Sequence, residues 1–357
     1  MENIIEQKSS RIGIENVDWN NLKFGVYFSD HMYVSDYENG KWNKGKILPY
    51  SDLGVEPANC TLHYGQTIFE GLKAFPSKKG GVNIFRPDMN GIRMMKSAES
   101  VCIPPYPVED FVDAVKELVR IDSDWIPKKR GESLYLRPFS FGTGNFLGVS
   151  ASDTYKFVII TSPVASYYAE GLNPVKIIVE TERVRAVQGG LGSAKTAANY
   201  AASLLAGQKA HKKGFSQVLW LDGVHRKYID EVGAMNIVFV INNEIVTPSL
   251  DKGNILAGVT RNTVITLAED WKMNVSEREI SIDEVIESHK NGSLKEVFGT
   301  GTAAVISPVG MLDYKGKEMI INDMKIGKIA QRMYDTITGI QYGEMEDIHH
   351  WNVNINV

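Results

Sequence analysis

The chain has 357 residues, of which 43% are hydrophobic and 23% charged, with a formal net charge of −4. This balance excludes a disordered chain, and the lack of a large basic cluster argues against nucleic-acid binding. No apolar run approaches the roughly 20 residues that span a bilayer, and residues 1–10 lack the apolar core of a signal peptide. Cys60 and Cys102 form no metal or redox motif. We expect a cytoplasmic protein with reduced thiols and with no metal, membrane or nucleic-acid partner.

The length fits two domains, because a domain usually holds about 100–200 residues. In the first half, β-branched and aromatic runs predict strands, helical spacing of apolar residues predicts helices, and Asn39-Gly40 predicts a turn. The predicted strands cover 23–28, 133–139 and 155–161, and the predicted helices cover 64–74, 88–100 and 109–123.

Residues 162–174 (SPVASYYAEGLNP) interrupt this pattern with Pro, Gly and Asn. Strongly periodic segments lie on both sides, so we place the domain boundary there. The prediction is an N-terminal domain over 1–165, an interdomain loop over 166–175 and a C-terminal domain over 176–357.

The second half combines hairpins with helices. One hairpin is predicted to turn at Asp222-Gly223 and another near Asn242-Asn243. Strands paired by tight turns, with helices between them, indicate an α+β fold rather than repeated βαβ units. The strand before the hairpins is predicted over 175–180, and helices are predicted from about 196 to 213, from about 260, and over 325–338.

A glycine-rich turn precedes a lysine in the segment 188–200 (QGGLGSAKTAANY). The nucleotide-binding loop G-x-x-x-x-G-K-[ST] needs glycine before the lysine, so that the loop can wrap closely around phosphate. Ala194 occupies that position here, which disfavours a nucleotide-binding or regulatory protein, the alternative from another function class. A surface lysine at the start of a helix is the plainer alternative.

The residues around Lys195 favour a buried, reactive lysine. The preceding loop is rich in small residues and can approach a bulky ligand, and the following TAANYAASLLAG is rich in Ala and other apolar residues. Burial removes the solvation of an ammonium group, so the neutral, nucleophilic amine is favoured. Such an amine suits Schiff-base chemistry with a carbonyl compound.

Several segments, taken together and in order, resemble the branched-chain amino acid aminotransferases among the class IV, fold-type-IV pyridoxal-phosphate enzymes. The resemblance runs from about Phe24 to Pro308, and no single segment would carry it alone. The segments are FGVYFSDHM (24–32), LHYGQTIFEGLKAF (62–75), GIRMMKSA (91–98), LYLRPFSFGT (134–143), GSAKTAANY (192–200), DEVGAMNIVFV (230–240), ILAGVTRNTV (255–264) and GTGTAAVISPV (299–309).

The resemblance implies a two-domain fold like that of D-amino acid aminotransferase, with a smaller α/β N-terminal domain and a larger C-terminal domain with a barrel-like β core. It also implies a transaminase of branched-chain amino acid biosynthesis. Such an enzyme transfers an amino group reversibly between L-leucine, L-isoleucine or L-valine and 2-oxoglutarate by ping-pong chemistry with pyridoxal 5′-phosphate. Members of this family form homodimers.

The resemblance assigns Lys195 as the catalytic residue, which binds the cofactor aldehyde and moves a proton between substrate and cofactor. Glu231 corresponds to the acid that keeps the pyridine nitrogen protonated. Its neighbour Asp230 is the alternative, and it should point the opposite way on an extended strand. Tyr200 corresponds to the tyrosine that bonds the phenolic oxygen. Without the resemblance, Glu231 is an exposed carboxylate at a hairpin end and Tyr200 a core aromatic.

The resemblance also assigns a phosphate site. Arg93 corresponds to the phosphate arginine, and its guanidinium can pair with phosphate through two donors. Gly258, Val259 and Thr260 precede an apolar-periodic run, so they offer backbone N–H groups at a helix start, and Thr260 adds a hydroxyl. Gly301-Thr302 supplies further backbone donors. An ordinary helix cap is the alternative for residues 258–260.

The substrate side follows from the same resemblance. An aromatic, mostly apolar pocket suits branched aliphatic side chains, while Arg137 is placed to meet the side-chain carboxylate of glutamate. Tyr135 and Arg137 are two residues apart and so share one face of a strand. The α-carboxylate is expected at the backbone amides of Thr302 and Ala303. The residues expected around the substrate are Phe24, Tyr64, Phe69, Tyr135, Tyr167 and Ala303. Ordinary core packing is the competing interpretation for Phe24 and Phe69.

A relative with the same fold but another reaction is the nearest alternative, either a D-amino acid aminotransferase or an aminodeoxychorismate lyase. The paired segments HYGQTIFEGLKAF and LYLRP favour the branched-chain group. The chain is also longer than those relatives usually are.

Overall fold

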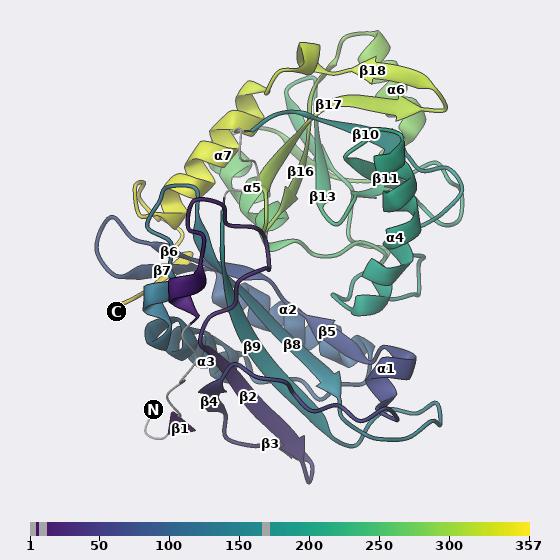
Figure 1. Ribbon diagram of the computed structural model, residues 1–357. Coiled ribbons are helices and arrows are strands. Elements are labelled where there is room, and N and C mark those ends of the chain that lie inside the picture. The colour runs from purple at the N-terminus through teal and green to yellow at the C-terminus, as the bar shows by residue number, and fades with distance from the viewer. Residues whose placement is uncertain (1–4, 7–12, 166–171) are drawn as a thin grey trace. The chain divides into compact units, whose positions relative to one another are not determined.

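The computed structural model of the protein describes residues 5–6, 13–165 and 172–357 (Figure 1). The chain forms two compact units: unit 1 holds Met1–Tyr167, Ala194–Ala197 and Gly339–Val357, and unit 2 holds Tyr168–Ser193 and Ala198–Thr338. After it has entered unit 2, the chain returns to unit 1 twice, at Ala194–Ala197 and at Gly339–Val357. The first of these segments carries Lys195. A prediction of consecutive domains along the sequence does not include such returns.

A ten-stranded sheet forms the centre of unit 1. Its strands are β1 (Ile5–Glu6), β2 (His31–Glu38), β3 (Lys41–Trp42), β4 (Lys46–Pro49), β5 (Thr67–Phe69), β6 (Leu72–Pro76), β7 (Val82–Phe85), β8 (Ser133–Gly142), β9 (Tyr155–Val164) and β19 (Asn352–Ile355). The order is β1-β4-β2-β9-β8-β6-β7-β19, with β3 paired to β2 and β5 paired to β8. The long antiparallel pair of β8 and β9 runs from Ser133 opposite Val164 to Gly142 opposite Tyr155.

Helices cover one face of this sheet (Figure 1). The helices of unit 1 are α1 (Cys60–Tyr64), α2 (Pro87–Ser100) and α3 (Val108–Ile121), with short 3₁₀ turns at Ile14–Asn16 and Ser123–Trp125. In α3, Phe111, Val115 and Leu118 recur at helical spacing and are buried against the sheet residues of one core cluster. Burial of this apolar stripe, more than helix propensity, holds α3 in place.

A nine-stranded mixed sheet forms the centre of unit 2. Its strands are β10 (Val175–Val179), β11 (Gln217–Leu221), β12 (Ile229–Val232), β13 (Asn236–Ile241), β14 (Glu244–Thr247), β15 (Val275–Glu277), β16 (Leu294–Gly301), β17 (Val305–Tyr314) and β18 (Lys317–Ile320). The order is β12-β11-β10-β17-β16-β13-β14-β15, with β18 paired to β17. The central strand β10 is parallel to both of its neighbours, whereas β16 is antiparallel to β13 and β17.

Four α-helices belong wholly or partly to unit 2: α4 (Ala197–Lys212), α5 (Val259–Asp270), α6 (Ile282–Lys290) and α7 (Lys328–Gln341), with a 3₁₀ turn at Asn322–Met324. Helix α6 begins after Ser281, whose side chain accepts a hydrogen bond from the backbone of Glu284. At the start of α7 the buried carboxylate of Glu296 accepts the backbone N–H groups of Ile329 and Ala330, both at 2.9 Å. An acid at a helix N-terminus is favoured by the helix dipole.

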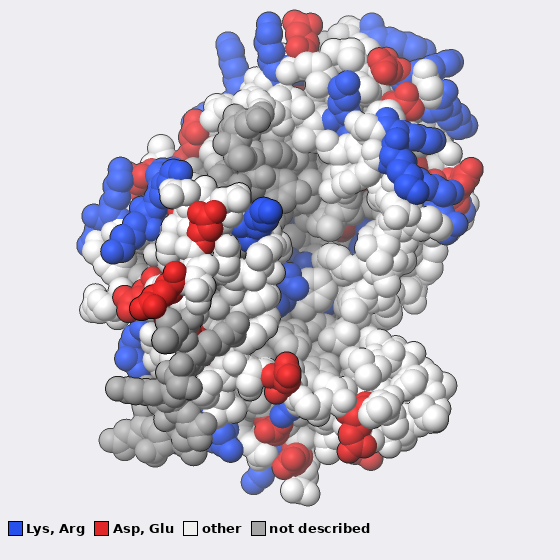
Figure 2. Space-filling model, viewed as in Figure 1, with Lys and Arg blue, Asp and Glu red and all other residues white. Residues whose placement is uncertain are grey.

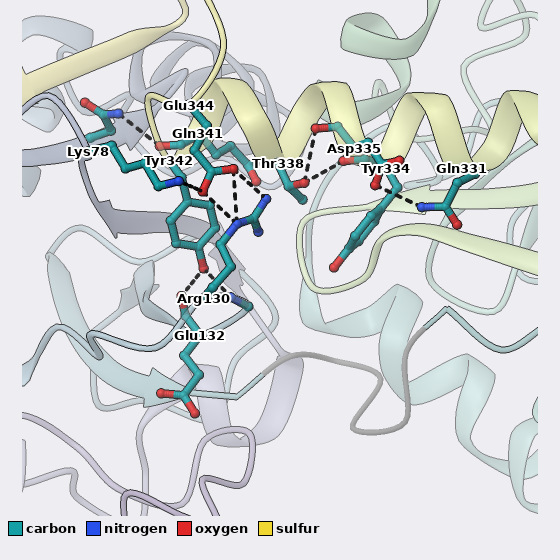
Figure 3. Close-up of polar contacts among 12 residues, drawn as sticks. Lys78, Arg130, Glu132, Gln331, Tyr334, Asp335, Thr338, Gln341, Tyr342 and Glu344 are labelled. Carbon is teal, nitrogen blue, oxygen red and sulfur yellow. Dashed lines mark hydrogen bonds and ion pairs between the residues drawn. The ribbon is translucent and has the colours of Figure 1, made fainter.

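The end of α7 and the residues after it, Gly339–Val357, belong to unit 1 and contact its other segments (Figure 3). The Tyr342 hydroxyl donates to the backbone oxygen of Glu132, while the Glu344 carboxylate pairs with Arg130 and Lys78, each at 3.1 Å. Strand β19 then pairs with β7. The C-terminal residues therefore cover a sheet edge that would otherwise expose unpaired backbone groups.

Most predicted helices and strands are confirmed, but two predictions in the first half are wrong. Residues 23–28 form no strand, because Gly25 adopts a φ of +66° in a turn and the strand begins later, at His31. Residues 64–74 form no helix. Helix α1 ends at Gly65 with a φ of +67°, and β5 and β6 follow.

The two predicted hairpins differ in outcome. The turn at Asn242-Asn243 is confirmed, with φ values of 51° and 63°. Strands β11 and β12 also pair antiparallel, but the predicted two-residue turn between them is wrong. The connection covers 222–228, because the Asp222 carboxylate accepts backbone N–H groups from four of its residues and holds a wider loop.

None of the helices in the described part of the chain is long and apolar enough to cross a membrane. On the face drawn in Figure 2, acidic and uncharged side chains interrupt the basic ones.

Candidate active site

Backbone hydrogen bonds attach the Lys195 segment to unit 1. The Phe69 N–H donates to the Lys195 carbonyl at 3.0 Å, and the Lys195 N–H donates to the Ser97 hydroxyl at 2.9 Å. The Thr196 hydroxyl donates to the carbonyl of Thr67 at 2.7 Å. Thr196 forms an isolated β-bridge with Ile68 of β5, and α4 begins at the next residue, Ala197. The backbone of Lys195 is therefore held beside β5, just before the helix.

The Lys195 amine lies beside the ring of Phe69, with Nζ 4.8 Å from the ring centroid. Burial lowers the pKa of the amine to about 8, and the positive charges of Arg93 and Arg137 act in the same direction against Glu70 and Tyr135. A neutral amine is the form that attacks a carbonyl carbon. The local environment therefore makes Lys195 a better nucleophile near neutral pH than an exposed lysine.

Arg93, on α2, is paired with Glu70, which follows β5. The guanidinium donates through Nε to Glu70 Oε1 at 2.8 Å and through Nη2 to Oε2 at 2.7 Å. Asn90 Nδ2 adds a bond to Oε2 at 2.7 Å. Burial alone would raise the pKa of Glu70, but the charge and hydrogen bonds of Arg93 outweigh burial and hold this pKa below its usual range. Arg93 therefore remains a fixed cation.

Four of the predicted substrate residues are grouped in unit 1. The Arg137 guanidinium carbon lies 4.7 Å from the Phe69 ring centroid, and Nη2 donates to the Tyr135 hydroxyl at 3.0 Å. The rings of Phe24 and Tyr135 meet edge to face at 4.8 Å. Gly71 leaves space for this tyrosine, since a Cβ there would lie 2.2 Å from the Tyr135 hydroxyl oxygen. Phe69 and Phe24 are thus parts of a polar–aromatic cluster with Arg137.

Two other predicted substrate residues lie apart from this cluster or outside the described residues. Tyr64, at the end of α1, donates its hydroxyl to the carbonyl of Leu147 in the loop after β8. Tyr167 lies outside the described residues.

Glu231 is buried on β12 in unit 2. Its Oε2 lies 3.1 Å from Arg185 Nε, and its Oε1 accepts the backbone N–H of Leu256 at 2.8 Å. The Asn236 side chain approaches the same Oε1 at 3.4 Å. The alternative of an exposed carboxylate at a hairpin end is wrong: the side chain is buried, ion-paired and hydrogen-bonded.

The same asparagine connects Glu231 to the predicted phosphate residues. Asn236 donates to the Leu256 carbonyl at 2.8 Å, and a Cβ on Gly258 would lie 1.9 Å from Asn236 Oδ1. Only glycine fits there. Helix α5 begins directly after it, with Val259 and Thr260 in the first turn, both buried. Glu231 and the N-terminus of α5 thus belong to one packed group.

The remaining predicted cofactor residues also lie in unit 2. Tyr200 is half-buried in the first turns of α4. Thr302 and Ala303 form the short turn between Gly301, at the end of β16, and Val305, at the start of β17. Val305 has a φ of +61°, which is costly for a β-branched residue and so indicates a turn fixed by its surroundings.

The amino-acid sequence matches the family model for amino-transferase class IV over residues 67–311. The chain belongs to the class IV aminotransferases. It is 56% identical over 339 residues to "Branched-chain-amino-acid aminotransferase 2" of Bacillus subtilis, covering 95% of this chain and 93% of that one. It is also 49% identical over 357 residues to "Branched-chain-amino-acid transaminase 1" of the same organism, covering 99% of this chain and 100% of that one. Among solved structures, it resembles the Escherichia coli branched-chain amino acid aminotransferase with a TM-score of 0.75 and 26% identity, over 92% of this chain and 100% of the other.

Sequence reasoning missed four residues that contact predicted site residues or their neighbours: Glu70 in unit 1, and Arg185, Asn236 and Asn254 in unit 2. Each is buried and bound to a residue already singled out or to its neighbour. A charged residue in a mostly apolar stretch, such as Glu70 between Phe69 and Gly71, is the local signal that could have found one of them. The stretch TERVR (181–185) contains two arginines, and only the fold shows that Arg185 pairs with Glu231.

Proposed function

We propose that this class IV aminotransferase exchanges the amino group between leucine, isoleucine or valine and 2-oxoglutarate, with pyridoxal 5′-phosphate as cofactor. The observation that carries the proposal is Lys195, an amine with a pKa lowered to about 8 beside the Phe69 ring. The names of the relatives supply the substrate class, since the Bacillus subtilis protein at 56% identity is a branched-chain-amino-acid aminotransferase.

The donors and acceptors of the chain suit this cofactor. Lys195 offers an amine for the aldehyde, Glu231 a buried carboxylate for the ring nitrogen, and the first turn of α5 a set of backbone N–H groups for phosphate. Tyr200 is proposed at the phenolic oxygen, and Gly301 and Thr302 at the phosphate. When bound, the cofactor supplies an electron-accepting ring that stabilises negative charge at the substrate Cα.

Lys195 has two tasks in this proposal. Its neutral amine would hold the cofactor aldehyde, and Nζ would also serve as the base that takes the proton from the substrate Cα. A pKa near the working pH suits a group that must both accept and return a proton.

Arg93 and Glu231 provide fixed charges of opposite sign. Arg93 is proposed to bind the phosphate, and Glu70 holds its guanidinium in one orientation through two hydrogen bonds. Glu231 is proposed to keep the ring nitrogen protonated, with Arg185 as its ion-pair partner. Charges fixed by packing need no reorganisation during the reaction.

The substrate side is proposed to involve the cluster around Arg137. Phe24, Phe69 and Tyr135 offer apolar contact for a branched aliphatic side chain. Arg137 Nε is buried without a hydrogen-bond partner among the described residues, so it can receive the side-chain carboxylate of glutamate. The backbone amides of Thr302 and Ala303 are proposed for the α-carboxylate, and Tyr64 and Tyr167 remain predictions for the same pocket.

We also propose a homodimer. Leu62, Leu147 and Val149 are 65%, 66% and 86% exposed, and the Tyr64 hydroxyl connects α1 to the loop that carries two of them. Exposed apolar side chains that lie close together are typical of interaction surfaces. Light scattering should give twice the mass of 39.7 kDa. A cytoplasmic location stays a prediction.

The test of the proposed function is the visible absorption of the purified protein with and without L-leucine. We expect a yellow protein whose absorption band is lost on addition of leucine and restored by 2-oxoglutarate. Lys195→Met should remove the band, whereas Lys73→Met should keep it. Lys73 is a matched control, because it is also buried in unit 1 with a pKa lowered by burial to about 8.

Two results would contradict the proposal. A protein that stays colourless with added pyridoxal phosphate excludes the cofactor. A yellow protein that ignores leucine and responds to D-amino acids keeps the family and excludes the substrate class.

A further inference from the structure

Two adjacent carboxyl groups are buried on β12. Asp230 and Glu231 expose 4% and 3% of their surface. Burial penalises both charges, and two neighbouring carboxylates also repel each other. The cation in contact with this pair is Arg185, whose Nε lies 3.1 Å from Glu231 Oε2. One cation beside two buried acids raises the question of which acid is ionised.

The hydrogen bonds of the two acids differ in kind. Glu231 accepts the backbone N–H of Leu256 at 2.8 Å and lies against the Arg185 guanidinium, so its partners are donors and a positive charge. Asp230 Oδ1 accepts only the neutral amide of Asn254, from Nδ2 at 2.8 Å, among the hydrogen bonds in the described part of the chain. Arg185 Nη2 is directed elsewhere, to the carbonyls of Gly192 and Asn254.

Two oxygens of the Asp230–Asn254 pair lack a partner. Asp230 Oδ2 and Asn254 Oδ1 are both buried and make no hydrogen bond to any described residue. Neither oxygen can donate while Asp230 is a carboxylate, so both would lose hydration without compensation. A proton on Oδ2 changes this, because the acid can then donate to the amide oxygen while it accepts from the amide nitrogen. One proton satisfies both oxygens.

We propose that Asp230 is held as the neutral acid in a two-hydrogen-bond ring with Asn254, so that Arg185 pairs with Glu231 alone and Glu231 stays ionised. Asp230, Asn254 and Arg185 are then positioning residues, and Glu231 is the group that meets the cofactor. The role of Glu231 in this inference rests on the proposed function, whereas the position of the proton does not.

The charges around Asp230 agree with this assignment. Burial raises the pKa of Asp230 to about 7; Arg185 and Asn254 oppose that rise, while Glu231 and Asp222 reinforce it. Asp222 remains charged: burial opposes ionisation there, but four backbone N–H donors hold its pKa below the usual range. Both neighbouring acids, Glu231 and Asp222, therefore favour the neutral form of Asp230.

The first experiment is an infrared difference spectrum between the wild-type chain and Asp230→Asn at about pH 5.5, well above the usual pKa of aspartate near 3.9. We expect the carbonyl band of a protonated carboxylic acid in the wild type and its loss in the variant. The difference is needed because burial also raises the pKa values of Asp122 and Glu132, which add acid bands of their own. A difference spectrum without this band overturns the proposal, whatever the colour of the protein.

The second experiment follows the free energy of unfolding with pH. A raised pKa means that the folded chain binds more protons than the unfolded chain between about pH 4 and 7. The wild type should therefore lose stability relative to Asp230→Asn as pH rises through that window. Asp222→Asn is the control: because its pKa is lowered, the wild type should show no such loss relative to this variant between about pH 4 and 7, and should lose stability relative to it only as pH falls below about 4. The proposal is contradicted if the free energy of unfolding of the wild type, relative to that of Asp230→Asn, increases as pH rises.

The third experiment compares variants by their affinity for pyridoxal phosphate. Asn at 230 can repeat both hydrogen bonds of the neutral acid, whereas Ala leaves Asn254 unpaired, so Asp230→Asn should bind at least about tenfold more tightly than Asp230→Ala. If both variants lose the same affinity for pyridoxal phosphate, the proposal that Asp230 is a neutral acid is contradicted. Arg185→Met should weaken cofactor binding as well. If Arg185→Met binds pyridoxal phosphate as tightly as the wild type, the proposed cofactor role of Glu231 is overturned. The acid band in the infrared difference spectrum would still support a proton on Asp230.

Discussion

Glu70 binds Arg93 through two parallel hydrogen bonds, at 2.8 and 2.7 Å, and both side chains are buried. A paired guanidinium of this kind cannot rotate, so its position is set by the carboxylate. Glu70 directly follows Phe69, whose N–H binds the Lys195 carbonyl. Arg93 and Lys195 are thus attached to two consecutive residues, Glu70 and Phe69, at the end of β5.

Replacing Glu70 by Gln should destabilise the fold and weaken cofactor binding together. The change leaves the Arg93 charge buried without its counter-charge, which costs about 3–5 kcal/mol in comparable buried pairs. Urea unfolding measures the free energy, and a titration with pyridoxal phosphate measures the affinity.

The matched control for this prediction is Glu117→Gln. Glu117 pairs with Arg120 on the half-exposed surface of α3, where an ion pair contributes about 0–1 kcal/mol. Equal losses in the two variants would show that Glu70 has no special relation to Arg93.

The reaction of cofactor-free protein with pyridoxal phosphate should depend on pH through Lys195. Its amine has a pKa of about 8, lowered first by burial, so the neutral fraction falls about tenfold for each pH unit below 8. The rate of colour formation should rise with pH and level off above 8. Stopped-flow absorbance measures this rate. The control variant Lys73→Met should show the same dependence of the rate on pH as the wild type. A midpoint near 10 would mean that burial does not act on Lys195.

The sequence predicted the fold best where residues dictate their own backbone. Asn242 and Asn243 tolerate the left-handed conformation, and their hairpin formed as expected. The segment 64–74 failed for the opposite reason. Its apolar spacing fits a helix, but β5 and β6 both pair with the distant strand β8, where Thr67 lies opposite Phe141 and Leu72 lies opposite Leu136; β6 also pairs with β7. Local spacing carries no information about such a partner.

The candidate site residues show the same contrast between local sequence signals and contacts that form only in the fold. Lys195 and Glu231 could be predicted as site residues because a family pattern marks their positions. Arg185 could not, because Arg183 lies two residues away in the same stretch and nothing local separates the two. In the fold, Arg185 is buried against Glu231 and Arg183 is exposed. Supporting residues of this kind act through tertiary contacts, so only the structure identifies them.

Replacing Gly192 by Ala should destabilise unit 2, although the residue lies in a loop. A Cβ there would lie 2.2 Å from the Asn254 carbonyl oxygen, which also accepts from Arg185. Displacing this backbone should cost about 1–3 kcal/mol, as overpacking does elsewhere. Cofactor affinity should fall too, because Arg185 moves with its acceptor.

Gly207→Ala is the control for the glycine prediction. Gly207 lies within α4, and a Cβ there would meet nothing within 4 Å. Alanine in an open helix position should stabilise the chain by about 0.5–1 kcal/mol. Thermal unfolding of both variants measures the contrast, and a Gly192→Ala protein as stable as the wild type would exclude close packing against Asn254.

Replacing Arg137 by Met should separate the two halves of the reaction. Glutamate and 2-oxoglutarate carry a side-chain carboxylate that needs a cation, whereas leucine does not. The kcat/KM for glutamate should fall about 100-fold, since a site built for a charged group loses its pairing partner, and that for leucine should change less than about threefold. Single-turnover absorbance changes with each amino acid give both values separately.

Tyr135→Phe tests whether the orientation of this cation matters. The variant keeps the ring that meets Phe24 and removes the hydroxyl that accepts from Arg137 Nη2 at 3.0 Å. Arg137 then retains its charge and its position over Phe69 but loses one of the contacts that orient it. We expect a smaller loss in the same direction, confined to glutamate and 2-oxoglutarate. If Arg137→Met lowers kcat/KM equally for glutamate and for leucine, Arg137 supports the packing of the aromatic cluster and does not bind the substrate carboxylate.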